Sequence, residues 1–297
     1  MSVGTRGSTL ALTQTGLVVS ALQTLHPGLD FTTHIIHTQG DRNQHSSLQA
    51  IGGQGAFVGE IESALLRGEI DLAVHSMKDM PAAERPGLAL HPALERQDPR
   101  DVLISRGHVP LVELPSGARV GTGSARRIAQ LRQLRPDLTI LDIRGNVDTR
   151  LRKLDAGEYD AIVIAAAGLL RLGLEGRVTE YFRVEDMIPA PGQGILAVQT
   201  RDDEWLRGIV TPLVHRQTQV AARAERAFLA RLGAGCQLPV AAHATVSEDG
   251  RLTLHTMLGS EDGSLAVRQV ETTDLDGAAA LGAAMAEVSL RRMEGAL

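Results

Sequence analysis

The sequence predicts an α/β protein of two hinged lobes, followed by a small α+β domain. Short apolar runs alternate with longer helical patterns through the first two thirds of the 297 residues, as βαβ units do around parallel sheets. Two polar or Pro/Gly-rich breaks, 95–101 and 188–194, could carry the chain from one lobe to the other and back. After about residue 216, alternating runs separated by short turns indicate an antiparallel sheet.

The period of the apolar residues predicts the elements of the two lobes. Leu10, Leu17 and Leu25 repeat at near-helical intervals and predict a helix over Thr9–Leu25. The same spacing predicts a helix over Ser124–Leu134. The strands that we expect are Phe31–His37, Ile70–Val74, Arg119–Gly121, Leu138–Ile143 and Ala161–Ala165.

The last third is predicted to be a separate α+β domain. Its antiparallel sheet has three strands, Pro239–Val246, Arg251–Leu258 and Leu265–Glu271. One helix precedes the sheet (Gln217–Leu232) and one follows it (Leu275–Glu294). The expected domains are residues 1–95 with 195–215, residues 96–194, and residues 216–297.

The composition argues against several classes of protein. The formal net charge of −5 and the low aromatic content disfavour a nucleic-acid-binding surface. A single cysteine excludes an intramolecular disulfide, and no Cys/His spacing suggests a metal site. The N-terminus lacks a signal-peptide pattern, and the longest apolar stretch, Ala161–Leu170, is too short to span a bilayer. We therefore expect a cytoplasmic protein without metal, nucleic-acid or membrane partners.

A lysine and an aspartate follow one of the predicted strands. Lys78 and Asp79 lie in HSMKDMP, directly after Ile70–Val74, and Lys153 is the only other lysine of the chain. Ligands of open α/β sheets gather beyond the carboxyl ends of strands. A carboxylate beside a cation in such a cleft suits proton transfer or stabilisation of a cation. The alternative is an ion pair in a solvated loop.

Arginines follow other strand ends. GTGSARR places Ser124 at a helix N-cap and Arg126 and Arg127 in the first turn, where cations oppose the helix dipole unless an anion lies nearby. The alternative is that both side chains point into water. Two further turns, IRGNVDTR and TRGSTLAL, contribute Arg144 and Arg150, and Arg6 and Ser8. Because each charged hydrogen bond contributes roughly 1.5–3 kcal/mol, these turns together predict a ligand with several carboxylates or phosphates.

Two loops add further candidates. Cys236 lies in LGAGCQLP, a turn that can expose its sulfur as a nucleophile or covalent anchor, although free cysteines are more often buried. The Gly-rich stretch 39–57 is expected to be a mobile lid or a plain surface loop.

Six motifs in this order resemble the porphobilinogen deaminase (hydroxymethylbilane synthase) family over nearly the whole chain. They are AVHSMKDMP, GTGSARR, IRGNVDTRLRKL, IVIAAAGLLRLGL, IPAPGQG and GAGCQLPVAAHA. The resemblance implies two lobes like type II periplasmic binding proteins, a third domain that carries a cysteine, and a monomer. It also implies a transferase that joins four porphobilinogen molecules head to tail with loss of ammonia. Hydrolysis then releases linear hydroxymethylbilane for tetrapyrrole, porphyrin and heme biosynthesis.

The resemblance also assigns roles to residues. It implies that Cys236 holds a dipyrromethane cofactor, itself made from two porphobilinogen units, through a thioether. It implies that Asp79 is the catalytic carboxylate, which assists proton transfer as ammonia leaves and stabilises the cationic azafulvene. The residues implied to bind the carboxylates of the cofactor are Lys78, Thr122, Ser124, Arg126, Arg127 and Arg150, and those of the substrate are Arg6, Ser8, Arg144 and Arg171.

Four positions depart from the family pattern. Family members often carry lysine where Gln54, Gly59 and Leu170 stand, and serine where Gly123 stands. The departures concern auxiliary carboxylate contacts and leave the chemistry unchanged.

Two rival functions come from other classes. A two-lobed anion-binding protein would explain the arginines but would give Cys236 and the third domain no task. A pyridoxal-phosphate enzyme with Lys78 as its Schiff-base lysine would absorb visible light.

Overall fold

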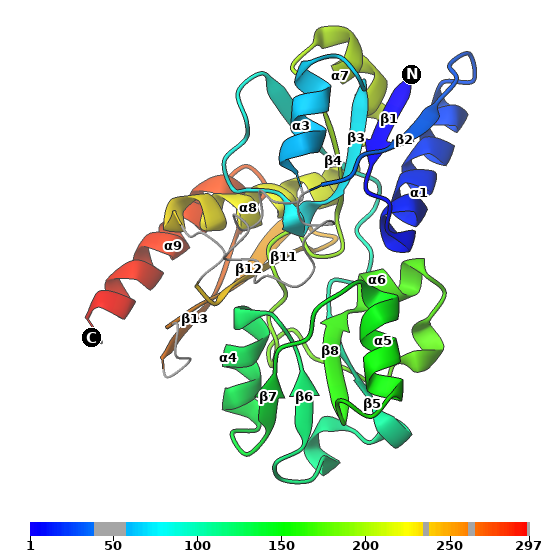
Figure 1. Ribbon diagram of the computed structural model, residues 1–297. Helices are drawn as coiled ribbons and strands as arrows, with labels where there is room; N and C mark the ends of the chain where they lie inside the picture. The colour runs from blue at the N-terminus through cyan, green and yellow to red at the C-terminus, as the bar shows by residue number, and fades with distance from the viewer. Residues whose placement is uncertain (39–57, 234–237, 261–264, 296–297) are drawn as a thin grey trace.

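The computed structural model describes residues 1–38, 58–233, 238–260 and 265–295, which form three sheets with their own helices (Figure 1). The first lobe lies at the top of Figure 1, the second at the bottom, and the C-terminal domain beside them. The predicted class of two α/β lobes with a small α+β domain is confirmed. The domain boundaries given by the sequence remain a prediction.

The first lobe is built on a five-stranded sheet of order β2-β1-β3-β10-β4. Strands β1, β2 and β3 are parallel, and β10 runs antiparallel to both of its neighbours. The elements are β1 (Ser2–Thr5), α1 (Thr9–Leu25), β2 (Thr32–Ile35), α3 (Gly59–Leu66), β3 (Leu72–Ser76), β4 (Leu88–Ala93), β10 (Leu196–Arg201) and α7 (Glu204–Val210). Helix α1 begins and ends where its leucine period predicts.

The second lobe repeats this plan with the order β7-β6-β8-β5-β9. Strands β6, β7 and β8 are parallel, and β5 runs antiparallel to β8 and β9. The elements are β5 (Asp101–Ser105), β6 (Arg119–Gly121), α4 (Ala125–Leu134), β7 (Thr139–Leu141), α5 (Val147–Asp155), β8 (Ala161–Ala165), α6 (Ala166–Arg171) and β9 (Glu180–Tyr181). Apolar side chains bury both faces of this sheet, which explains the near-continuous apolar run of β8.

Two crossings join the lobes and lie against each other. The first leads from β4 to β5 and the second leads back to β10. The backbone N–H of Gln97 donates to the carbonyl of Gly194 at 3.2 Å. Gly194 has a φ of +87°, and a Cβ there would lie 2.2 Å from the carbonyl oxygen of Gln97. Glycine therefore permits a contact that no other residue would allow.

The C-terminal domain packs two helices on one face of its antiparallel sheet. Its elements are α8 (Arg216–Leu232), β11 (Val240–Val246), β12 (Arg251–Gly259), β13 (Ala266–Asp274) and α9 (Ala278–Glu294). Phe228 of α8, Met285 of α9 and Leu254 of β12 are buried together in the core between helices and sheet. The order of helix, three strands and helix confirms the prediction for this part of the chain.

A buried glutamate joins the C-terminal domain to both crossings. Glu225 of α8 accepts hydrogen bonds from Arg96 Nη1 at 2.6 Å, from the N–H of Gly192 at 2.6 Å and from the N–H of Ala244 at 2.7 Å. Arg96 belongs to the first crossing, Gly192 to the second and Ala244 to β11. The three parts of the molecule therefore meet at one carboxylate.

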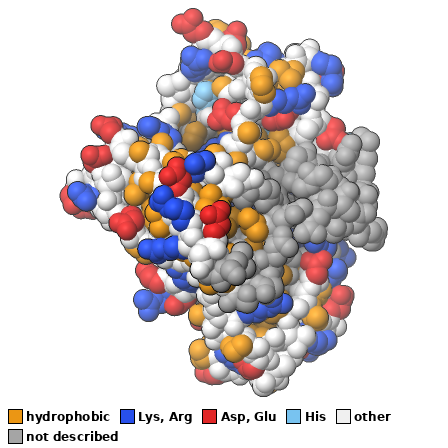
Figure 2. All heavy atoms as spheres, turned by 90° about the vertical axis from the view of Figure 1, so that its left-hand side faces the viewer, with side chains coloured by type: hydrophobic (Ala, Val, Ile, Leu, Met, Phe, Trp, Pro, Cys, Tyr) orange, Lys and Arg blue, Asp and Glu red, His pale blue; other side chains and the backbone are white. Residues whose placement is uncertain are grey.

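The surface carries both signs of charge. Figure 2 shows acidic and basic side chains interspersed with apolar ones on the face that lies on the left in Figure 1. Among the described helices, none has the length and apolarity needed to cross a membrane.

Candidate active site

The predicted site residues of the first lobe follow two parallel strands. Lys78 and Asp79 form a short 3-10 turn directly after β3, and Arg6 and Ser8 follow β1. Ser8 caps helix α1, because its Oγ accepts a hydrogen bond from the backbone N–H of Ala11 at 3.3 Å. The turns lie at the carboxyl ends of neighbouring strands, as the sequence predicts.

The second lobe contributes three more strand ends. Thr122 and Ser124 follow β6, Arg144 and Arg150 follow β7, and Arg171 ends the helix that follows β8. Strands β6, β7 and β8 are adjacent and parallel, so their carboxyl ends meet at one edge of the sheet. Ser124 occupies the N-cap position of α4 but makes no side-chain capping hydrogen bond there.

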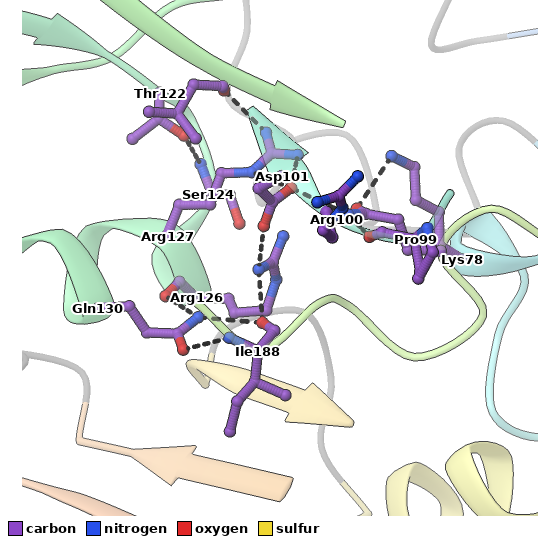
Figure 3. A network of polar contacts seen from close by, with 12 residues as sticks. Lys78, Pro99, Arg100, Asp101, Thr122, Ser124, Arg126, Arg127, Gln130 and Ile188 are labelled. Atoms are coloured by element: carbon purple, nitrogen blue, oxygen red, sulfur yellow. Dashed lines mark hydrogen bonds and ion pairs between the residues drawn. The ribbon is translucent and has the colours of Figure 1, made fainter. Parts of the chain in front are cut away.

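Arg126 and Arg127 are buried and form ion pairs with Asp101, an aspartate of their own lobe (Figure 3). Arg126 Nη1 lies 2.6 Å from Asp101 Oδ2, and Arg127 Nη2 lies 2.8 Å from Asp101 Oδ1. The two guanidinium groups hold the pKa of the fully buried Asp101 far below its usual value, against the effect of burial. The Asp101 carboxylate is therefore the anion that compensates these two cations at the helix N-terminus.

Gln193 of the second crossing connects this cluster to the first lobe. Its Nε2 donates to Asp101 Oδ1 at 2.9 Å and to the carbonyl of Pro99 at 2.7 Å. Its Oε1 lies 3.5 Å from Lys78 Nζ. Burial lowers the pKa of Lys78 to about 8, and the nearby Asp79 opposes that shift without reversing it.

The two lobes face each other through these charges. Burial, helped by the positive charges of Arg127 and Arg144, lowers the pKa of Arg150 to about 10, and Asp142, with Asp79 of the first lobe, opposes this shift. Arg150 Nε donates to the carbonyl of Gly145 at 2.8 Å. Arg171 Nη2 donates to the carbonyl of Gly194 at 2.7 Å. Asp79 thus lies within electrostatic reach of a cation from the opposite lobe.

The donor set fits a ligand that carries several carboxylates. Burial lowers the pKa of Lys78, Arg150 and Arg171, so a bound carboxylate would stabilise the charged form of each. The buried Nε of Arg126 also has no hydrogen-bond partner among these residues. Planar guanidinium groups at strand ends suit bidentate binding of carboxylates.

Two predicted features lie outside the described residues. Cys236 falls between α8 and β11 in the sequence, within 234–237, and the expected lid 39–57 falls between β2 and α3. Gln54 belongs to that second segment. Among the described residues, no three His, Cys, Asp or Glu side chains are grouped as a metal site would need.

Sequence reasoning missed Asp101 and Gln193. Asp101 is the last residue of the polar break 95–101 and the first of strand β5, and Gln193 lies in the break IPAPGQG. Both breaks were recognised as crossings, and a polar residue at the end of a crossing was the one available signal. Asp101 lies 25 residues from Arg126 and 92 residues from Gln193 in the chain, so both contacts form only in the folded protein.

Comparisons with known proteins cover nearly the whole chain. A family model described as "porphobilinogen deaminase, dipyromethane cofactor binding domain" matches residues 1–206, and one described as "porphobilinogen deaminase, C-terminal domain" matches residues 219–290. The chain belongs to the porphobilinogen deaminase family. A porphobilinogen deaminase of Roseiflexus sp. is 51% identical over 96% of this chain and 94% of its own. A porphobilinogen deaminase of Deinococcus radiodurans is 48% identical over 98% and 96%.

Solved structures with likeness to this member of the porphobilinogen deaminase family include two periplasmic proteins. An arginine-specific periplasmic binding protein of Salmonella typhimurium matches with a TM-score of 0.43 and 14% identity, over 72% of this chain and 91% of its own. The periplasmic VFT2 domain of BvgS from Bordetella pertussis matches with a TM-score of 0.40 and 18% identity, over 72% and 92%.

The described departures from the porphobilinogen deaminase pattern differ in their surroundings. Gly59 begins helix α3, and a Cβ there would meet no atom within 4 Å. Leu170 packs against the core of the second lobe, one residue before Arg171. Gly123 has a crowded neighbourhood, because a Cβ there would lie 2.7 Å from Asp142 Oδ1.

Proposed function

We propose that this chain is a hydroxymethylbilane synthase, the transferase that is also called porphobilinogen deaminase. It joins four porphobilinogen molecules head to tail, releases ammonia and hydrolyses the product to linear hydroxymethylbilane for tetrapyrrole biosynthesis. The observation that carries the proposal is that Asp79 lies within electrostatic reach of Lys78 and of Arg150 from the opposite lobe, in a chain that belongs to this family.

The cations divide between the cofactor and the substrate. Lys78, Arg126, Arg127 and Arg150, with the Thr122 and Ser124 hydroxyls, would hold the acetate and propionate groups of a dipyrromethane. That cofactor, when bound, supplies a covalently held pyrrole chain to which each new unit is added. The residues that would hold the carboxylates of the incoming porphobilinogen are Arg6, Ser8, Arg144 and Arg171. Since Arg126 and Arg127 already bind Asp101, they would offer a ligand only their remaining N–H groups.

Asp79 is the catalytic residue of this proposal. Its carboxylate lies beside Lys78 and within reach of the charge of Arg150, where it can hold a positive group between the lobes. Asp79 would stabilise the cation that forms as ammonia leaves porphobilinogen and would hold the transferred proton on a carboxylate oxygen. Because the Asp79 carboxylate is already in position, no energy is spent on reorienting it as the positive charge develops.

Cys236 is the proposed thioether anchor of the cofactor. A tether makes each addition effectively intramolecular, which can lower the barrier by up to roughly 7–11 kcal/mol. The monomeric state, which the family resemblance implies, is a further part of the proposal. So are the cytoplasmic location and the lack of nucleic-acid and membrane partners, which composition and the N-terminal pattern favour.

The experiment that tests the proposal is the intact mass of the purified, untreated protein. The mass should exceed that of the sequence by two condensed porphobilinogen units, and peptide mapping should place them on the segment with Cys236. Dithiothreitol should leave the addition in place, because a thioether does not exchange with thiols. Added porphobilinogen should produce further species at single-unit spacing, and Cys236→Ser should abolish loading.

Two outcomes would contradict the proposal. An active protein with a bare Cys236 and no ladder of masses would exclude the tethered mechanism. An inactive protein that only binds carboxylates would favour a two-lobed binding protein.

A further inference from the structure

An acidic side chain stands among the arginines of the second lobe. Asp142 directly follows β7, and its Oδ2 accepts a hydrogen bond from Arg144 Nε at 2.9 Å. Asp142 and Asp79 both raise the pKa of Arg150, so both carboxylates act on the same part of the site. The mechanism proposed above leaves Asp142 without a task.

Glycine at position 123 makes room for this carboxylate. Gly123 follows β6, the parallel neighbour of β7, and a Cβ on it would lie 2.7 Å from Asp142 Oδ1 and 3.6 Å from Arg144 Nε. The backbone of Asp142 is fixed, because the Tyr159 hydroxyl donates to its carbonyl at 2.8 Å. A Cβ at position 123 would also lie 3.2 Å from the carbonyl oxygen of Ile143, so a side chain there would displace the Asp142 carboxylate and press on the backbone next to it.

The contact between Asp142 and Arg144 leaves one edge of the guanidinium available. Asp142 occupies Nε, and within the described residues neither Nη nitrogen of Arg144 has a hydrogen-bond partner. The two Nη nitrogens form an edge that can bind a second carboxylate bidentately. The Asp142 side chain is 59% exposed, so the ion pair contributes little to stability.

We propose that Gly123 and Asp142 act together to position Arg144, so that its Nη edge is presented to a carboxylate of the incoming porphobilinogen. Asp142 is then a positioning residue and Arg144 the residue that touches the substrate. The inference rests on the proposed function and deepens it, because it identifies what orients one of the substrate-binding arginines in this chain.

The test compares five variants of the loaded protein, one of them a control, with the wild type. The measurements are KM and kcat for porphobilinogen, and the porphobilinogen concentration at which half of the protein carries one added unit by intact mass. Asp142→Ala and Gly123→Ser should each raise KM and that concentration roughly threefold, the size expected for an exposed ion pair, with kcat changed less. Asp142→Asn should give a KM at or below that of the wild type, because its amide oxygen still accepts from Nε while the competing charge is gone.

The double variant decides whether the two positions act through one contact. Gly123→Ser with Asp142→Ala should be no worse than either single change, because the first already displaces what the second removes. Asp137→Ala, which breaks an ion pair with Arg135 at the far end of α4, is the control and should leave KM unchanged.

Several results would overturn the inference while the wild type still adds porphobilinogen units. KM values lowered by both Asp142→Ala and Asp142→Asn would mean that Asp142 only competes for positive charge. Unchanged KM values in Gly123→Ser and Asp142→Ala, or effects of these two changes that add, would exclude a shared role. A wild type that adds no units would instead overturn the proposed function, and this inference with it.

Discussion

At the scale of single residues, Lys78 differs from the other site cations because its charge can be removed at moderate pH. Its pKa is lowered from 10.5 to about 8 by burial, whereas arginine stays protonated. Asp79 and Asp101 raise this pKa, and Arg126 and Arg127 lower it, but burial has the largest effect. Lys78 should therefore set the alkaline limit of carboxylate binding.

We predict that loading of the apo protein with dipyrromethane, made from added porphobilinogen and followed by intact mass, weakens as the pH increases through about 8, because neutral Lys78 no longer attracts a carboxylate of the cofactor. Lys78→Arg should remove this dependence, and Lys78→Met should weaken loading at every pH. Over the same range the sign for stability is opposite. The unfolded chain keeps the proton up to 10.5 and the folded chain releases it near 8, so the free energy of unfolding should increase between these values. Cofactor loading independent of pH from 7 to 9 would contradict the assignment.

We predict that Asp79→Asn preserves the fold and the cofactor but reduces kcat by roughly 10²–10³-fold, the usual effect of removing one electrostatic stabiliser. The amide keeps the shape of the side chain and removes the charge that a developing cation needs. Turnover of porphobilinogen and the intact mass of the variant check the two parts. The control is Asp137→Asn, which changes an aspartate far from the site and should turn over normally. A loaded Asp79→Asn protein with near wild-type turnover would exclude the role.

The sequence predicted the site residues that follow strand ends but not the residues that support them. Lys78 and Asp79 could be predicted because a strand, a turn and a proline adjoin them in the chain. Asp101 could not, because its partners lie on a helix that only the fold brings to strand β5. The pattern of Arg126 and Arg127 pointed correctly to a nearby anion, but the sequence could not distinguish a ligand from a side chain of the protein.

At the scale of elements, the N-terminus of α4 is held to β5 by the contact of Arg126 and Arg127 with Asp101. We predict that Asp101→Asn lowers the free energy of unfolding by about 3–5 kcal/mol, because two buried cations lose their counter-charge. Urea unfolding followed by circular dichroism measures the change. Asp137→Asn breaks an exposed ion pair of the same helix and should cost less than about 1 kcal/mol. Equal effects of the two changes would contradict this account.

Local pattern predicted some elements to the residue and left others unnamed. Helix α1 and strands β6 and β8 have the predicted bounds, because their apolar period or run ends at clear breaks. Strands β1, β4, β5, β9 and β10 were not predicted. Strand β9 has only two residues, and β5 and β10 are extended because they pair with strands that are distant in the sequence. Such pairing leaves no periodic signal in a short window.

At the scale of the whole molecule, the hydrogen bonds of Glu225 join the C-terminal domain to the two crossings between the lobes. We predict that Glu225→Gln lowers the free energy of unfolding by about 3–5 kcal/mol, since Arg96 would be left buried without a counter-charge. Calorimetry should also show the C-terminal domain unfolding apart from the lobes, because the links to both crossings weaken together. Glu287→Gln breaks an exposed pair between α8 and α9 and serves as the control. A single transition at the wild-type temperature would refute the prediction.

The contact between the two crossings limits how the lobes can move. A single connecting strand can twist as well as bend, and the lobes on either side of it could rotate freely about its axis. Here Gln97 and Gly194 bind side by side, and two segments joined in this way bend together but resist twisting. We expect this contact to favour opening and closing of the lobes over twisting about the crossings. Such a motion would keep the strand ends of one lobe opposite those of the other.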